Sequence, residues 1–85
     1  MTAQLDLFPT ALQLCRIDAE QNMQRFYRLC LQPDLFGGCT LIREWGRIGS
    51  GGRVRHDVYP SEGQAVSALV SMSAAKTRRG YVTAS

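Results

Sequence analysis

No run of apolar residues in this 85-residue sequence approaches the roughly 20 residues that a membrane-spanning helix requires. The start of the chain carries no basic segment ahead of a continuous apolar stretch, which argues against a secretory signal peptide. Internal repeats and low-complexity segments are also missing. We therefore expect a soluble cytoplasmic protein with one domain and a single modest core, and no contact with a membrane.

Cysteine and histidine are too few and too scattered to predict a metal site. The three cysteines are Cys15, Cys30 and Cys39, and the sole histidine is His56. Structural zinc sites use four such ligands, usually in close pairs, and no close pair exists here. His56 and Asp57 are neighbours in a predicted strand and point to opposite faces, so they form no catalytic dyad. We expect no metal, no cofactor, no catalytic residue and no enzymatic activity.

Lysine is almost absent, because nine of the ten basic residues are arginines. The net charge of +3 is modest and only weakly favours an anionic partner. Arginine, however, binds phosphate through paired hydrogen bonds from a planar guanidinium group. The positions of the arginines therefore carry more information than their sum.

Apolar and polar residues alternate in four segments, which predicts four strands. These segments are 11–17, 23–32, 39–49 and 53–59. The segment 33–38 contains a proline, an aspartate and two glycines, and the segment 50–52 reads "SGG", so both are predicted to be turns between strands. The segment 23–59 is thus predicted to form an antiparallel meander.

A helical period begins after Pro60. Ser61 is a good N-cap residue, and Gln64 three residues later completes a capping box. Gly80 follows a basic last turn and is a natural residue for ending the helix. One face of the helix is apolar, with Ala65, Val66, Leu69, Val70 and Met72 at helical spacing.

These elements predict an α+β fold. We expect a small antiparallel sheet of four to five strands, with one C-terminal helix packed across one face. The segment 81–85 is the candidate for the fifth strand. The domain is expected to occupy residues 11–85, after an N-terminal lead-in over residues 1–10.

The alternation also assigns faces to the only tryptophan and its neighbours. Arg43, Trp45 and Arg47 share one face of their strand, and Arg53 and Arg55 share one face of the next. The opposite faces carry the apolar side chains that a helix needs, namely Ile42, Ile48, Val54 and Val58. We therefore expect the helix to cover these residues and to leave Trp45 and the arginines on the bare side. A β-bulge at the glycines would exchange the two faces.

A tryptophan framed by arginines is a plausible contact set for nucleic acid. The indole offers a flat surface for a base or sugar, and the guanidinium groups bind backbone phosphates. The alternative is structural: a lone tryptophan in a small domain is more often part of the core, with arginines lying against its ring. Spacing alone leaves both interpretations open.

Several segments together resemble the WGR domain. They are "RFYRLCL", "DLFGG", "LIREWGRIGSGGR" and "KTRRGY", in this order, and the resemblance covers the chain from about Leu12 to Tyr81. It implies an antiparallel sheet with one helix across it. In the DNA-dependent poly(ADP-ribose) polymerases this domain binds DNA near a strand break. By this resemblance Trp45 would be a platform for a sugar or base, and Arg47 a contact to phosphate or to a partner.

The resemblance further implies that a polar residue just before the second strand lies near a 5′ phosphate, and Asn22 and Gln24 are the candidates. The 85 residues contain no zinc finger, no helical regulatory domain and no transferase domain, so polymerase activity is not implied. The chain is more similar to short stand-alone bacterial WGR proteins.

We hypothesise a non-enzymatic module that binds DNA with little sequence preference, through its backbone or ends. The candidate DNA-binding residues are Trp45, Arg47, Arg43, Arg53, Arg55, Asn22 and Gln24. The alternative is a protein–protein adaptor that uses the same surface, as an accessory to a separately encoded enzyme, because tryptophan and arginine are also enriched at protein interfaces. The oligomeric state stays open.

Overall fold

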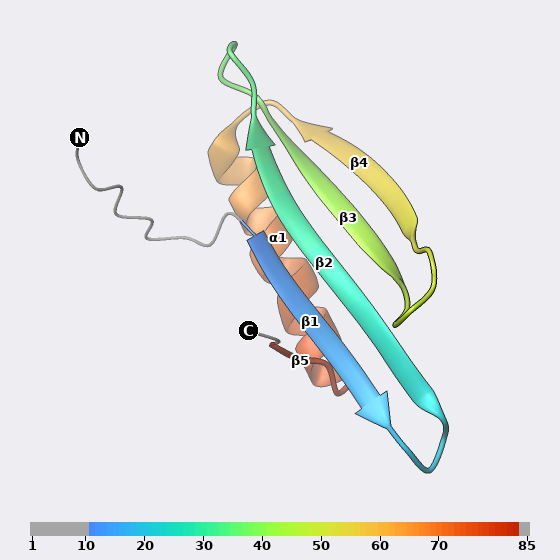
Figure 1. Ribbon diagram of the computed structural model, residues 1–85. Helices are drawn as coiled ribbons and strands as arrows, with labels where there is room; N and C mark the ends of the chain where they lie inside the picture. Colours follow the sequence, from blue (N-terminus) through green and yellow to red (C-terminus); the bar gives the residue numbers. More distant parts are fainter. Residues whose placement is uncertain (1–10, 84–85) are drawn as a thin grey trace, which may run out of the picture.

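A computed structural model of the chain describes residues 11–83; the expected lead-in over residues 1–10 lies outside the described residues. Five strands form one antiparallel sheet, and one helix lies across it (Figure 1). The elements are β1 (Ala11–Asp18), β2 (Met23–Pro33), β3 (Cys39–Arg47), β4 (Arg53–Tyr59), α1 (Glu62–Arg78) and β5 (Val82–Thr83). The strand order is β4-β3-β2-β1-β5. This arrangement confirms the predicted α+β class. Within the described part of the chain, no helix is long and apolar enough to cross a membrane.

The turn between β2 and β3 is held by a single carboxylate. Asp34 Oδ1 accepts hydrogen bonds from the backbone N–H groups of Phe36, at 2.7 Å, and Gly38, at 2.9 Å. Gly37 has a φ of 88°, a conformation that favours glycine. The turn presents Leu35 and Phe36 with 96% and 93% of their surface exposed. Figure 1 places it at one end of the molecule.

The helix begins and ends as the sequence predicts. Ser61 is the N-cap, and its Oγ accepts a hydrogen bond from the backbone N–H of Gln64 at 3.2 Å. At the other end Gly80 has a φ of 99°, which lets the chain turn back toward the sheet. Tyr81 is then buried against the core, and the next two residues form β5 at the edge of β1.

The core lies between α1 and one face of the sheet. Leu14, Leu29 and Leu41 come from three neighbouring strands and are at most 1% exposed. Ala65 and Leu69 of α1 pack against them in the same cluster. Burying a leucine side chain stabilises the fold by roughly 1.5–3 kcal/mol, so these contacts determine which face the helix covers.

The expected choice of faces is wrong. Leu41 faces the helix, and alternate residues of β3 share a face, so Arg43 and Trp45 also lie on the helix side. Val54 and Val58, expected beneath the helix, are 56% and 75% exposed on the other side. The reason is that β2 pairs with β3 in a register that aligns Leu29 and Leu31 with the face of Leu41, and this leucine-rich surface is the better partner for α1.

The face that α1 leaves uncovered, which we call the bare face, contains one buried aromatic side chain. Phe26 is 6% exposed because it lies against Gly46 and Gly52, and the guanidinium carbon of Arg28 lies 4.8 Å from its ring centroid. A Cβ at Gly46 would lie 3.0 Å from the Cα of Gly52. Phe26 thus fills the space that the two glycines leave.

Gly52→Ala should destabilise the fold, because the new Cβ would lie 2.6 Å from the carbonyl oxygen of Trp45 and 2.8 Å from Cζ of Phe26. We expect a loss of about 1–3 kcal/mol in the free energy of unfolding, measured by urea titration. Gly51→Ala is the matched control, since its Cβ would meet no atom within 4 Å. Equal stability of the two variants would contradict this packing.

Candidate nucleic-acid interface

The last three residues of β3 lie alternately on the two faces of the sheet. Trp45 and Arg47 lie on the helix side and Gly46 on the bare side. Trp45 is half-buried and packs against the edge of the core. Tyr27 is its partner in the register of β2, with ring centroids 6.1 Å apart and planes tilted by 34°. The indole is thus fixed on one side by the core.

Three cations surround these rings. Arg25 of β2 lies directly opposite Arg47 of β3, although like charges at such positions repel. Lys76, in the last turn of α1, reaches the same place from the helix. Together they line a groove, here called the cationic groove, whose walls are Arg25, Phe26, Tyr27, Trp45, Gly46, Arg47, Lys76 and Tyr81.

Lys76 is held over aromatic rings. Its Nζ lies 4.5 Å from the ring centroid of Tyr27 and 5.5 Å from that of Tyr81. Partial burial lowers the pKa of Lys76, and the positive charges of Arg79, Arg25 and Arg43 lower it further. The ammonium group therefore lies in a positive environment, which a bound anion would relieve.

The cations of the groove lack acidic partners within residues 11–83. Arg25, Arg47 and Lys76 take part in no ion pair there. The closest polar contact of Arg47 is a weak one, from its Nη1 to the carbonyl oxygen of Asn22 at 3.4 Å. Unneutralised cations next to a fixed aromatic surface are suited to an anionic, planar ligand.

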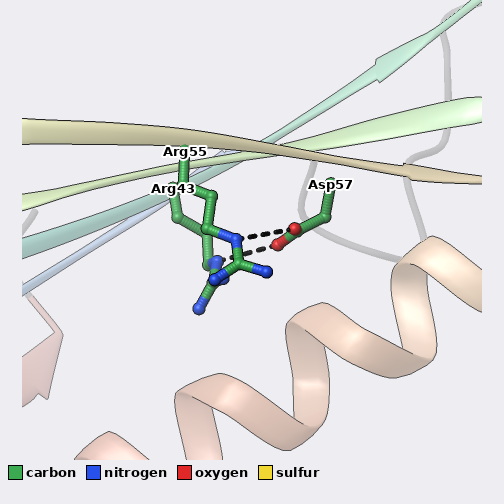
Figure 2. Close-up of polar contacts among 3 residues, drawn as sticks. All are labelled: Arg43, Arg55 and Asp57. Carbon is green, nitrogen blue, oxygen red and sulfur yellow. Dashed lines mark hydrogen bonds and ion pairs between the residues drawn. The ribbon is translucent and has the colours of Figure 1, made fainter.

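Two of the predicted arginines are instead held by one aspartate (Figure 2). Arg55 Nε donates to Asp57 Oδ1 at 2.9 Å, and Arg43 Nε lies 3.0 Å from Asp57 Oδ2 without the angle of a formed hydrogen bond. The side chains of Arg43 and Asp57 are only 18% and 19% exposed, whereas that of Arg55 is 64% exposed. Arg43 and Asp57 therefore form an inner pair beneath the helix.

Arg43 also supports the indole, with its guanidinium carbon 5.9 Å from the ring centroid of Trp45. Burial opposes the charge of Arg43, but its contacts with Tyr27 and Asp57 outweigh this, and the pKa is raised. Arg43 is thus a permanent cation that positions Trp45.

The remaining predicted residues lie at the margin. Arg53 is exposed and is the partner of Trp45 in the register of β4, on the helix side. Asn22 is an exposed turn residue with a φ of 52°. Gln24 belongs to the bare face, and its carbonyl oxygen accepts the N–H of Ile48 at 2.8 Å. The structure therefore brings Trp45 together with all four predicted arginines on one face, and separates Gln24 from them.

Sequence reasoning missed Arg25, Tyr27 and Lys76 as members of this site. The alternation of β2 already put Arg25 and Tyr27 on one face, but only the register shows that this face continues to Trp45 and Arg47. From the sequence, Lys76 is most simply a solvated charge that complements the helix dipole, and it would extend the basic surface only if the end of the helix met the rim of the sheet. Its reach over Tyr27 follows from the position of the helix on the sheet.

The charges are also unevenly distributed along the molecule. Neither lysine nor arginine occurs in residues 29–42 or 56–75. These segments form the β2–β3 hairpin, the end of β4 and most of α1, and they contain Asp34, Asp57 and Glu62. The cationic groove lies at the opposite end, beside the last turn of α1.

A small antiparallel sheet, one covering helix and a groove of cations and aromatic rings define a compact α+β module. The family model of the WGR domain matches residues 10–85, and the chain therefore belongs to the WGR domain family. It is 37% identical over 73 residues to Uncharacterized protein y4dW of Sinorhizobium fredii. The match covers 86% of this chain but 36% of that protein, so the chain spans about a third of its relative. No solved structure matches the chain.

Asp57→Asn should destabilise the protein, because it leaves the largely buried cation of Arg43 without its counter-charge. We expect a loss of about 1–3 kcal/mol in the free energy of unfolding by urea titration. Arg55→Gln, in the same cluster but exposed, should change stability by no more than about 1 kcal/mol. If the two substitutions cost the same, the inner pair has no special role.

Proposed function

We propose that this chain is a non-enzymatic DNA-binding module that contacts the backbone or ends of DNA, with little sequence preference, through the cationic groove. The observation that supports this most is the convergence of Arg25, Arg47 and Lys76 on a half-buried Trp45. Membership of the WGR family supports it by analogy, since the family includes DNA-binding domains of poly(ADP-ribose) polymerases.

The proposed contacts follow from the positions of the side chains. Arg25 and Arg47 are exposed and free of acidic partners in residues 11–83, so they would bind phosphate oxygens. Trp45 would offer the open part of its ring to a sugar or base. Arg53 would extend the contact along β4. Arg43 would act indirectly, by holding the indole.

Phosphate contacts do not depend on base identity, because the backbone is the same at every step. A ring that stacks on a sugar or base, by contrast, reaches its partner most easily where a strand ends or is interrupted. Together these interactions favour weak dependence on sequence and a preference for ends or breaks.

Binding should be measured with blunt, nicked and single-stranded DNA, using the fluorescence of the single tryptophan at several salt concentrations. Each phosphate contact should contribute about −0.9 to the slope of log K against log salt for duplex DNA. Arg25→Gln and Arg47→Gln should each reduce the slope by about this amount. Arg28→Gln, on the bare face, is the matched control and should leave the slope unchanged.

Trp45→Ala removes the fluorescent group, so this variant requires end-labelled DNA and anisotropy. It should abolish the preference for ends more than it lowers overall affinity, since the phosphate contacts remain. A loss of stacking corresponds to about 1–3 kcal/mol. Failure of the folded wild-type protein to bind any DNA at low salt would overturn the proposal, and the adaptor alternative would take its place.

Affinity for DNA should fall as pH rises through the lowered pKa of Lys76, below the usual 10.5. A bound phosphate favours the ammonium form, so the contact is fully present at neutral pH and is lost when the proton leaves. Lys76→Arg stays charged and should flatten this decline. Identical pH profiles for the two proteins would exclude Lys76 as a phosphate contact.

A further inference from the structure

The bare face has the composition of an interface. It carries the alternate residues of β1 to β4 that point away from α1, together with Val82 of β5. Among these residues only Arg28 and Glu44 are charged, in contrast with the arginine-rich helix side. The solvent face of an antiparallel sheet is usually polar, and depletion of charge marks the core of protein interfaces.

Large apolar side chains are exposed on this face. Ile17, Val54 and Val58 are 68%, 56% and 75% exposed, and each belongs to a regular strand rather than a loop. Ile42 lies between them on β3 and is partly buried. The strands β1, β3 and β4 therefore each contribute apolar side chains to a face that the described chain does not cover.

The two charges of the face form a pair at its centre. Arg28 Nη1 lies 3.0 Å from Glu44 Oε1, and the residues are register partners on the central strands β2 and β3. Both side chains are partly open to solvent. One positive and one negative group side by side are self-complementary about a two-fold axis, where each would face its opposite on a second copy.

The size of the face is sufficient for a dimer. The five strands have 8, 11, 9, 7 and 2 residues, which gives about 600 Å² from standard strand spacings. This is at the lower end of the ~600–1,000 Å² that each partner contributes to a stable interface.

We propose that the bare face is the interface of a symmetric homodimer, in which Arg28 of each chain meets Glu44 of its partner and Ile17, Val54 and Val58 are buried between the two sheets. The cationic grooves lie on the opposite faces, so the dimer leaves both of them open. The proposal concerns association without nucleic acid and does not depend on the proposed function.

Sedimentation equilibrium of the wild-type chain across the micromolar range should show a shift from 9.4 kDa to twice this mass. Val58→Glu should keep the protein monomeric, because it places a charge in the apolar contact. Val70→Glu, at a 52% exposed position on the outer side of α1, is the matched control and should dimerise like the wild type. Circular dichroism confirms that each variant is folded.

A charge-reversal pair tests the identity of the partner. Arg28→Glu alone and Glu44→Arg alone each place like charges across the two-fold axis, so each variant should be monomeric. An equimolar mixture of the two should form a heterodimer, because opposite charges meet again at the interface. The chain carrying both substitutions should form a homodimer.

A wild-type chain that stays monomeric at the highest concentration overturns the proposal, and so does a mixture that fails to associate. Dimers that persist in Val58→Glu and in both single charge variants place the interface elsewhere, which also overturns it. None of these results changes how the DNA titrations are interpreted, so the two proposals fail separately.

Discussion

The burial of a leucine-rich sheet face beneath a single helix determines the rest of this structure. Leu29, Leu41 and Leu69 meet in the core. Because successive side chains of a strand point to opposite faces, these leucines also determine the face of every other residue in their strands. Trp45 is carried to the helix side by Leu41, four residues earlier on the same strand. The same alternation sends Val54 and Val58 to the uncovered surface of the sheet. One packing contact thus divides the molecule into a basic face and a nearly neutral one.

The cationic groove illustrates a balance between folding and binding. Lys76 in the last turn is favoured by the helix dipole and by the rings beneath it, yet partial burial and then the neighbouring cations lower its pKa. Arg25 and Arg47 lie opposite each other on the neighbouring strands β2 and β3, where their like charges repel. Arg43 differs from these cations, because its largely buried charge is neutralised by the adjacent carboxylate of Asp57. The protein neutralises the cation that supports the indole and leaves the outer cations unpaired.

Much of the fold could be predicted from the sequence, because its signals are local. The alternation of apolar and polar residues located the strands. Asp34 and its glycines located the hairpin between β2 and β3, and Ser61 and Gly80 located the ends of the helix. The choice of faces could not be predicted in this way, since β3 and β4 carry apolar side chains on their other side as well. The decision depended on the register that joins β3 to the leucines of β2, and this is a long-range property.

The site was predictable to a similar degree. Trp45 and its four arginines do share a face, as their spacing indicated, but Arg43 and Arg55 are engaged with Asp57. That aspartate is two residues from Arg55 and lies across the strand pair from Arg43, so its role requires the β3–β4 register. Arg25 and Lys76 entered the site only when the sheet and the helix were placed together.

The uneven distribution of charge described above has a kinetic consequence. A body with most of its basic groups toward one end, and with Asp34, Asp57 and Glu62 in the segments that lack lysine and arginine, experiences a torque in the field of any polyanion. As the protein approaches the polyanion, this torque would turn the last turn of α1 toward it before any short-range contact forms. Encounters would begin already aligned, and productive collisions would be a larger fraction of the total than for a uniformly charged sphere.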